Sequence, residues 1–259
     1  EPVQSRRPDF RPVEFLRELR TLTEQTGSLL IFDEVVTGFR AHPRGVQGVF
    51  GIQADLASYG KVVGGAFSIG VIAGKRAFMD ALDGGHWEYG DASIPTVGVT
   101  YFAGTFVRHP LALATTKAML LHLQAAGPAL QEQLNARTAA MVAEINAHME
   151  ATGAPLVLKT YASWWRNNFT EDLPYSDLIY TMLRDRGIHI LDNFPCFLTT
   201  AHSDADIAAI VLAYKAAAAE MQASGFFPPA KAAAALVAAP GDARVVPSTE
   251  PQREMWLAD

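Results

Sequence analysis

An acid and an amine stand at the ends of two short strand-like runs early in the chain, the first of them entirely apolar. Residues 29–32 (LLIF) lead into Asp33, and residues 54–59 (ADLASY) lead into Gly60 and Lys61. A continuous apolar run of this kind is typical of a strand buried on both faces of a parallel sheet. Because ligands of open α/β sheets bind beyond the carboxyl ends of the strands, we expect Asp33 and Lys61 to face one crevice.

Two kinds of chemistry are open to this pair. The simpler is a salt bridge with no catalytic role. The other uses the lysine amine as a nucleophile and base, since a partly desolvated lysine loses its proton more readily than a solvated one. Lys75 and Lys117 are the competing lysines, but Lys75 follows a glycine-edged strand and Lys117 falls within a predicted helix, where a solvated charge is expected.

Three other kinds of site are excluded by motif spacing. A phosphate-binding loop that ends at Gly60 and Lys61 needs glycine at position 55 and serine or threonine at position 62, where the chain has Asp55 and Val62. The cysteine and histidine residues form no cluster with zinc-binding spacing. No Gly-x-Ser-x-Gly sequence provides a nucleophilic serine. The sequence therefore predicts no metal site.

The composition limits the class of protein. The chain has 259 residues, of which 49% are hydrophobic, and a formal net charge of -6. The negative charge argues against a nucleic-acid partner or an anionic membrane, because both select basic surfaces. One cysteine, Cys196, excludes an internal disulfide and suits a reducing compartment, so we expect a cytoplasmic protein. No apolar run has membrane-spanning length.

Hydrophobic periodicity predicts two α/β regions. A helix at 12–25 feeds the strand at 29–32, and strands at 54–59 and 67–74 follow, which is the pattern of a doubly wound domain. Residues 83–104 have no period and predict a loop that faces substrate or a second subunit. The remaining predicted elements are helices at 110–123, 128–150, 177–186 and from Ser203, with strands at 156–158, 161–169, 188–191 and 196–199.

Three stretches carry a family resemblance. FDEVVTGFR at 32–40, YGKVVGG at 59–65, and AGTF at 103–106 ahead of HPLA at 109–112 resemble the signatures of class III aminotransferases, in the glutamate-1-semialdehyde aminomutase branch. The resemblance extends to about residue 225. It implies the α/β fold of fold type I transferases that use pyridoxal 5'-phosphate (PLP), with part of a large domain and its mainly parallel sheet at 1–125 and a smaller C-terminal α/β domain at 126–225.

The resemblance also implies site residues. Lys61 would hold PLP covalently and carry a proton between substrate and cofactor, and Asp33 would pair with the pyridine nitrogen. Val35 would pack on the ring, although an ordinary core valine is an open alternative. Gly104 and Thr105 would bind the phosphate from the neighbouring subunit, which implies a homodimer.

The sequence departs from the family at two points. Val36 replaces a common glutamine, and Arg108 with His109 replaces a Gly-Asn pair. Arg108 would lie near the phosphate or substrate, or else on the surface. The family's ring-stacking aromatic residue and phosphate-binding Gly-Ser turn would precede residue 1, so we interpret the chain as part of a longer protein. We expect the isolated chain to bind PLP weakly or not at all, and the full-length domain to bind it covalently.

Two further stretches resemble parts of polyketide and nonribosomal-peptide synthases. WEYGDAS at 87–93 is similar to aminotransferase domains in such synthases, although Trp87 and Tyr89 could equally anchor a surface loop. After an alanine- and proline-rich linker at 226–246, residues 247–259 resemble the start of a condensation domain. The implied activity is transfer of an amino group from an amino-acid donor to a keto substrate, such as a β-ketoacyl thioester on a carrier protein. An intramolecular aminomutase and a non-catalytic docking or dimerisation module stay open.

Overall fold

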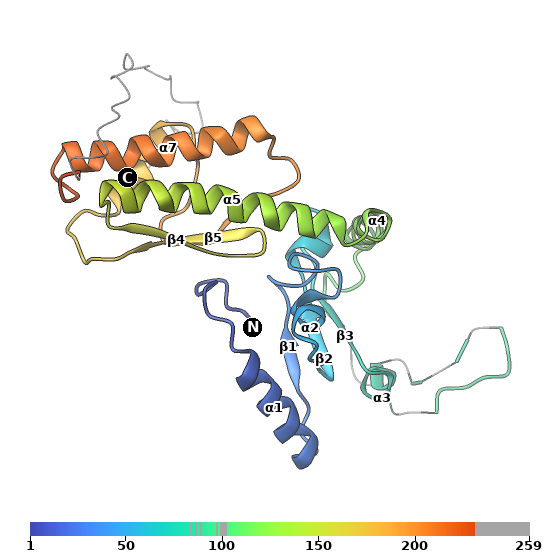
Figure 1. Cartoon of the computed structure of the whole chain (residues 1–259). Helices are drawn as coiled ribbons and strands as arrows, with labels where there is room; N and C mark the ends of the chain where they lie inside the picture. The colour runs from blue at the N-terminus through green and yellow to red at the C-terminus, as the bar shows by residue number, and fades with distance from the viewer. Residues whose placement is uncertain (83, 86, 89, 97, 99–102, 231–259) are drawn as a thin grey trace.

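The computed structural model describes residues 1–230 except positions 83, 86, 89, 97 and 99–102. Two small sheets with associated helices make up this part of the chain (Figure 1). No helix in these residues is long and apolar enough to cross a membrane. The elements of the first half are α1 (Val13–Thr26), β1 (Ile31–Asp33), α2 (Gly45–Phe50), β2 (Leu56–Tyr59), the 3-10 helix η1 (Lys61–Gly64), β3 (Val71–Gly74), α3 (Arg76–Met79) and η2 (Asp80–Leu82).

The first sheet has the strand order β1-β2-β3. Strands β1 and β2 are parallel, with Asp33 opposite Ser58, whereas β3 pairs with β2 in the antiparallel direction. The predicted helix at 12–25 is confirmed as α1, and Gly27 ends it in the left-handed conformation with φ of 69°. Because β1 and β2 run the same way, Asp33 and Lys61 both follow the carboxyl end of a strand at one edge of the sheet.

Strand β1 is buried on one face only, so the prediction of burial on both faces is wrong. Phe32 is buried with Leu16 of α1 and Ala57 of β2. The neighbouring Ile31 points to the other face and is 61% exposed. Helix α1 packs against the Phe32 face, whereas Ile31 on the other face is left exposed.

A buried carboxylate ties α1 to this sheet. Asp55, just before β2, accepts hydrogen bonds from the Leu30 backbone N–H at 2.8 Å and from Arg20 at 2.8 Å, and its other oxygen pairs with Lys75 at 2.7 Å. The Lys75 ammonium, followed by the Leu30 N–H, holds the pKa of Asp55 well below its usual range. Lys75 is therefore ion-paired, not merely solvated.

Asp55→Asn is expected to lower the free energy of unfolding at pH 7 by about 3 kcal/mol, because two cations lose their partner. The folded-state pKa lies below the unfolded value of about 3.9, so the contribution is full above about pH 5 and is lost as the pH falls through the folded-state pKa. Urea unfolding of both proteins at several pH values measures the difference. Asp9→Asn, which breaks a more exposed pair with Lys159, is the control and should cost less than about 1 kcal/mol.

The second half places helices against one face of an antiparallel sheet of strand order β4-β5-β6. Helices α5 and α7 lie side by side along this sheet (Figure 1). The predicted capping box at the start of α7 is confirmed, with Ser203 and Asp206 exchanging hydrogen bonds. The elements are α4 (Pro110–Ala126), α5 (Ala129–Thr152), β4 (Leu156–Tyr161), β5 (Trp164–Phe169), α6 (Leu178–Asp185), β6 (Cys196–Phe197) and α7 (Asp204–Ala223).

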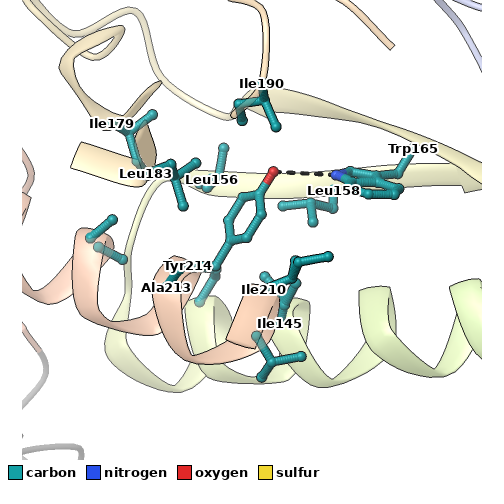
Figure 2. Close-up of a cluster of buried hydrophobic side chains, with 14 of the residues drawn as sticks. Ile145, Leu156, Leu158, Trp165, Ile179, Leu183, Ile190, Ile210, Ala213 and Tyr214 are labelled. Carbon is teal, nitrogen blue, oxygen red and sulfur yellow. Dashed lines mark hydrogen bonds between the residues drawn. The ribbon is translucent and has the colours of Figure 1, made fainter. Parts of the chain in front are cut away.

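The core of this half contains a short polar chain among aliphatic side chains (Figure 2). The indole N–H of Trp165 donates to the hydroxyl of Tyr214 at 3.2 Å, and that hydroxyl donates to Asn167 Oδ1 at 2.9 Å. Burial raises the pKa of Tyr214. The same buried cluster contains side chains from both long helices of this half. They are Met141, Ile145 and Met149 of α5 and Ile210 and Val211 of α7.

The predicted strand at 188–191 is absent, and this part of the chain is irregular backbone. The carbonyl of Ile190 accepts a hydrogen bond from the Arg184 side chain at 3.1 Å instead of pairing with a strand. Ile190 is buried, whereas Leu191 is 58% exposed. Side-chain bonding has replaced strand pairing here. At the other end of this half, Phe226 and Phe227, where the linker was predicted to begin, pack against the core.

The two halves meet around the loop that follows β1. Trp164 is fully buried on the face opposite Trp165 and clusters with Val3 and Val46. Arg40 donates to the carbonyl of Val36 at 3.1 Å and its guanidinium lies 4.4 Å from the centre of the Phe197 ring. Burial lowers the pKa of Arg40 to about 10. From α5, Gln131 and Asn135 donate to the carbonyls of Phe39 and Ala41 at 3.1 Å each.

Candidate active site

Asp33 presents one oxygen of its carboxylate without a partner. Oδ1 accepts from the Val35 N–H at 2.9 Å and, at 3.4 Å, from the hydroxyl of Ser58 on the neighbouring strand. Oδ2 takes part in no hydrogen bond or ion pair with the described residues. The side chain is exposed. The two contacts orient the carboxylate and leave Oδ2 available to a ligand.

Lys61 presents an amine without a counterion. It is exposed and begins η1 with φ of 48°, a left-handed conformation that residues with a side chain seldom adopt. Backbone strain of this kind is common at functional sites. Among the described lysines, Lys75, Lys159 and Lys215 form ion pairs, whereas Lys61 and Lys117 form none. Lys117 lies exposed on α4, as expected of a solvated charge.

Gly60 allows the two strand ends to approach each other. Its φ of -173° is ordinary extended backbone, so the glycine is needed for space. A Cβ at this position would lie 3.4 Å from Val35 Cγ1 and 3.2 Å from the carbonyl oxygen of Ile69. Val35 therefore packs beside the residue that precedes Lys61, and it links the Asp33 side of the edge to the Lys61 side.

A buried carboxylate that the sequence analysis did not single out supports this edge. Glu34 is fully buried and accepts hydrogen bonds from the N–H groups of Val46 and Gln47 at 3.0 Å each and from the Thr37 hydroxyl. Gly45 is required there, because its φ is 63° and a Cβ would lie 2.5 Å from the Glu34 oxygens. Glu34 thus fixes the loop after Asp33 to the start of α2.

Lys61 also lines a cavity between the two halves, with a volume of about 920 Å³. Val36 and Lys61 belong to the first half, and Trp165 of β5, residues of the irregular segment 186–195 and both residues of β6 come from the second. Asp33 and Val35 do not line the cavity. Val36, the residue after Val35, does line the cavity, and Val35 lies next to Gly60, the residue before Lys61. Of Asp33, Val35 and Lys61, only Lys61 therefore lines the cavity.

The predicted phosphate-binding residues lie elsewhere on the surface. Gly104 and Thr105 are exposed in the turn before α4, where Val107 N–H donates to the carbonyl of Gly104 at 3.1 Å. No hydrogen bond joins this turn to Asp33 or Lys61 in the residues that the structure describes. Trp87 is half-buried, and Tyr89 and residues 247–259 lie outside the described residues. The described cysteine, histidine and acidic residues form no cluster that could hold a metal ion.

Comparison with known proteins identifies the family. Residues 1–160 match the aminotransferase class-III family. The chain belongs to that family. It is 35% identical over 217 residues to the glutamate-1-semialdehyde 2,1-aminomutase of Nitratidesulfovibrio vulgaris, covering 78% of this chain and 47% of the relative. It is 40% identical over 157 residues to the aminomutase of Pyrobaculum calidifontis, covering 61% of this chain and 32% of the relative.

The fold of this class III aminotransferase chain matches solved transaminases. The β-phenylalanine aminotransferase of Variovorax paradoxus superimposes with a TM-score of 0.68 at 29% identity, covering 85% of this chain and 50% of that one. The fold is therefore that of fold type I transferases. The chain spans about half the length of curated relatives such as the aminomutases of Nitratidesulfovibrio vulgaris and Desulforapulum autotrophicum.

The residues at this edge fit PLP, the cofactor of the family. The fit rests on a lysine that has no counterion, and an acid that has one unpaired oxygen, among the described residues. Asp33 ends β1 and Lys61 follows the parallel neighbour β2. Lys61 could hold the aldehyde end and Asp33 Oδ2 the pyridine nitrogen. Val35 would contact the ring between them.

Proposed function

We propose that this class III aminotransferase chain forms part of a PLP-dependent enzyme that moves an amino group from an amino-acid donor to a keto substrate. The observation that carries the proposal is the pair of unengaged groups, the Lys61 amine and Asp33 Oδ2, beyond neighbouring strand ends. Bound PLP supplies an aldehyde that takes up the amino group and a ring that accepts electrons when the donor's carbon–hydrogen bond breaks. Over the full reaction the donor becomes a keto acid and the ketone becomes an amine.

Lys61 would act twice. Its amine would hold the cofactor between turnovers, and once a substrate amine takes its place, the free lysine would move a proton at the reacting carbon. The absence of a counterion supports both roles, because an ion pair such as that of Lys75 with Asp55 favours the protonated form.

Asp33 would hold a proton on the ring nitrogen through Oδ2. A fixed negative charge favours the protonated nitrogen, and the hydrogen bonds from Val35 and Ser58 to Oδ1 keep the carboxylate in one orientation. Val35, next to Gly60, would limit movement of the ring.

Gly104 and Thr105 would bind the cofactor phosphate of a second subunit. Their exposure, and the absence of a hydrogen bond from them to Lys61 among the described residues, support this role. Leu111 and Leu121 of α4, which are 50% and 54% exposed, would be covered in such a homodimer. We propose the domain limits 1–125, 126–225, 226–246 and 247–259 for the cofactor-binding domain, the small domain, the linker and a condensation-like segment.

The proposed acceptor is a β-ketoacyl thioester on a carrier protein, in a natural-product synthase of the cytoplasm. The competing candidate is an intramolecular aminomutase, supported by the names of the relatives from Nitratidesulfovibrio vulgaris and Pyrobaculum calidifontis. The two differ in whether a separate amino donor is consumed.

The deciding experiment incubates the intact PLP-loaded protein with a β-ketoacyl carrier protein and one candidate amino acid at a time. Mass spectrometry of the carrier-bound chain is expected to show conversion of the ketone to an amine only when a donor is present, because the amino group has no other source. Conversion of glutamate-1-semialdehyde without any donor, with no reaction of the acyl carrier, would select the aminomutase instead.

A further inference from the structure

The cavity that contains Lys61 has an apolar wall formed by the turn between α6 and β6. Leu191 and Phe194 of this turn line the cavity, and they are 58% and 53% exposed. Trp165 and Ile210 continue the apolar lining towards the core. Leu191 and Phe194 thus place two exposed apolar side chains on the wall of the cavity that Lys61 also lines.

The polar side chains of the turn are bonded to the protein and hold it in place. Arg184 of α6 donates to the Asp192 carboxylate at 2.6 Å, and Arg166 of β5 donates to the carbonyl of Asn193 at 3.3 Å. The hydroxyl of Tyr180 lies 3.4 Å from Asn193 Oδ1, and Asn193 adopts a left-handed φ of 59°. The middle residues of the turn are thus engaged with α6 and β5, which leaves the two flanking apolar side chains to contact a ligand.

We infer that the turn 191–194 binds the apolar chain of the amine acceptor. The inference rests on the proposed function, in which Lys61 is the reacting lysine, and Lys61 lines the same cavity. A volume of about 920 Å³ accommodates an extended chain in addition to the reacting carbonyl. A chain of methylene groups or an aromatic ring would bury Leu191 and Phe194, whereas a short charged acceptor would leave them in water. The turn therefore selects acceptors by the length of their apolar part.

The test measures binding without turnover. Acetyl, hexanoyl and decanoyl thioesters of N-acetylcysteamine carry no keto group and are titrated into the intact PLP-loaded protein by calorimetry. The affinity is expected to rise by up to about fourfold for each added methylene. Leu191→Ser and Phe194→Ser should each weaken decanoyl binding by about tenfold and leave acetyl binding unchanged.

Leu212→Ser is the matched control, because Leu212 is 65% exposed on α7 and does not line this cavity. Leu212→Ser should keep the chain-length dependence of the unmodified protein. Leu191→Met, unlike Leu191→Ser, should keep it as well. Equal affinity for the three thioesters in the unmodified protein, or the same loss in Leu212→Ser, would overturn the inference. Amino transfer at a rate that does not depend on the length of the acyl chain would overturn this inference but not the proposed function. Chain-length-dependent binding without any amino transfer would instead count against the proposed function.

Discussion

Lys61→Ala is expected to reduce amino transfer by at least about 10³-fold, because the variant loses both the group that holds the cofactor and the base that moves the proton. Borohydride treatment of the PLP-loaded protein, followed by peptide mass mapping, should place the cofactor on the peptide that contains residue 61 and find none on the variant. Steady-state rates with a donor and a β-ketoacyl acceptor give the size of the loss.

Lys117→Ala is the matched control for this experiment. Lys117 is the other described lysine without an ion pair, but it lies exposed on α4. Its removal should change the rate by less than about twofold, since an isolated surface charge contributes little. A Lys61→Ala protein that keeps its full product yield would mean that the chain is a non-catalytic docking module.

Asp33→Asn is expected to have the second-largest effect, a loss of about 10²-fold in the rate of amino transfer. The amide keeps the size of the side chain but cannot stabilise a positive charge on the ring nitrogen. Lys61 is unchanged, so the borohydride-trapped adduct should still form. Rapid mixing with a donor amino acid, followed by absorbance, measures the step in which the carbon–hydrogen bond breaks.

Ser58→Ala provides the graded comparison for Asp33. The Ser58 hydroxyl contacts Asp33 Oδ1 only at 3.4 Å, and the backbone N–H of Val35 holds the same oxygen at 2.9 Å. The rate should therefore fall by less than about fivefold, which corresponds to the loss of one weak hydrogen bond. If Asp33→Asn and Ser58→Ala slowed the reaction equally, the charge of Asp33 would have no special role.

The local pattern of the sequence was sufficient for most elements. The 3.6-residue spacing of Leu16 and its neighbours predicted α1, and the Ser203 and Asp206 pair predicted the start of α7. Helix periods and caps depend on residues within one or two turns of each other, so they can be recognised without knowledge of the fold. The predicted strand at 188–191 was wrong for a different reason. A short apolar run does not reveal whether a neighbouring strand exists to pair with it.

By itself, the sequence determined which groups were candidates for chemistry. Asp33 and Lys61 each end a strand-like run, and the direction shared by two parallel strands brings both to one edge. Only the tertiary structure decided which charged side chains form ion pairs or hydrogen bonds. Lys75 is neutralised by Asp55, twenty residues earlier, whereas Lys61 is not, and the loop after Asp33 depends on Glu34 meeting the N–H groups of Val46 and Gln47. These pairings join residues that are distant in the chain, and they are set by packing rather than by local pattern.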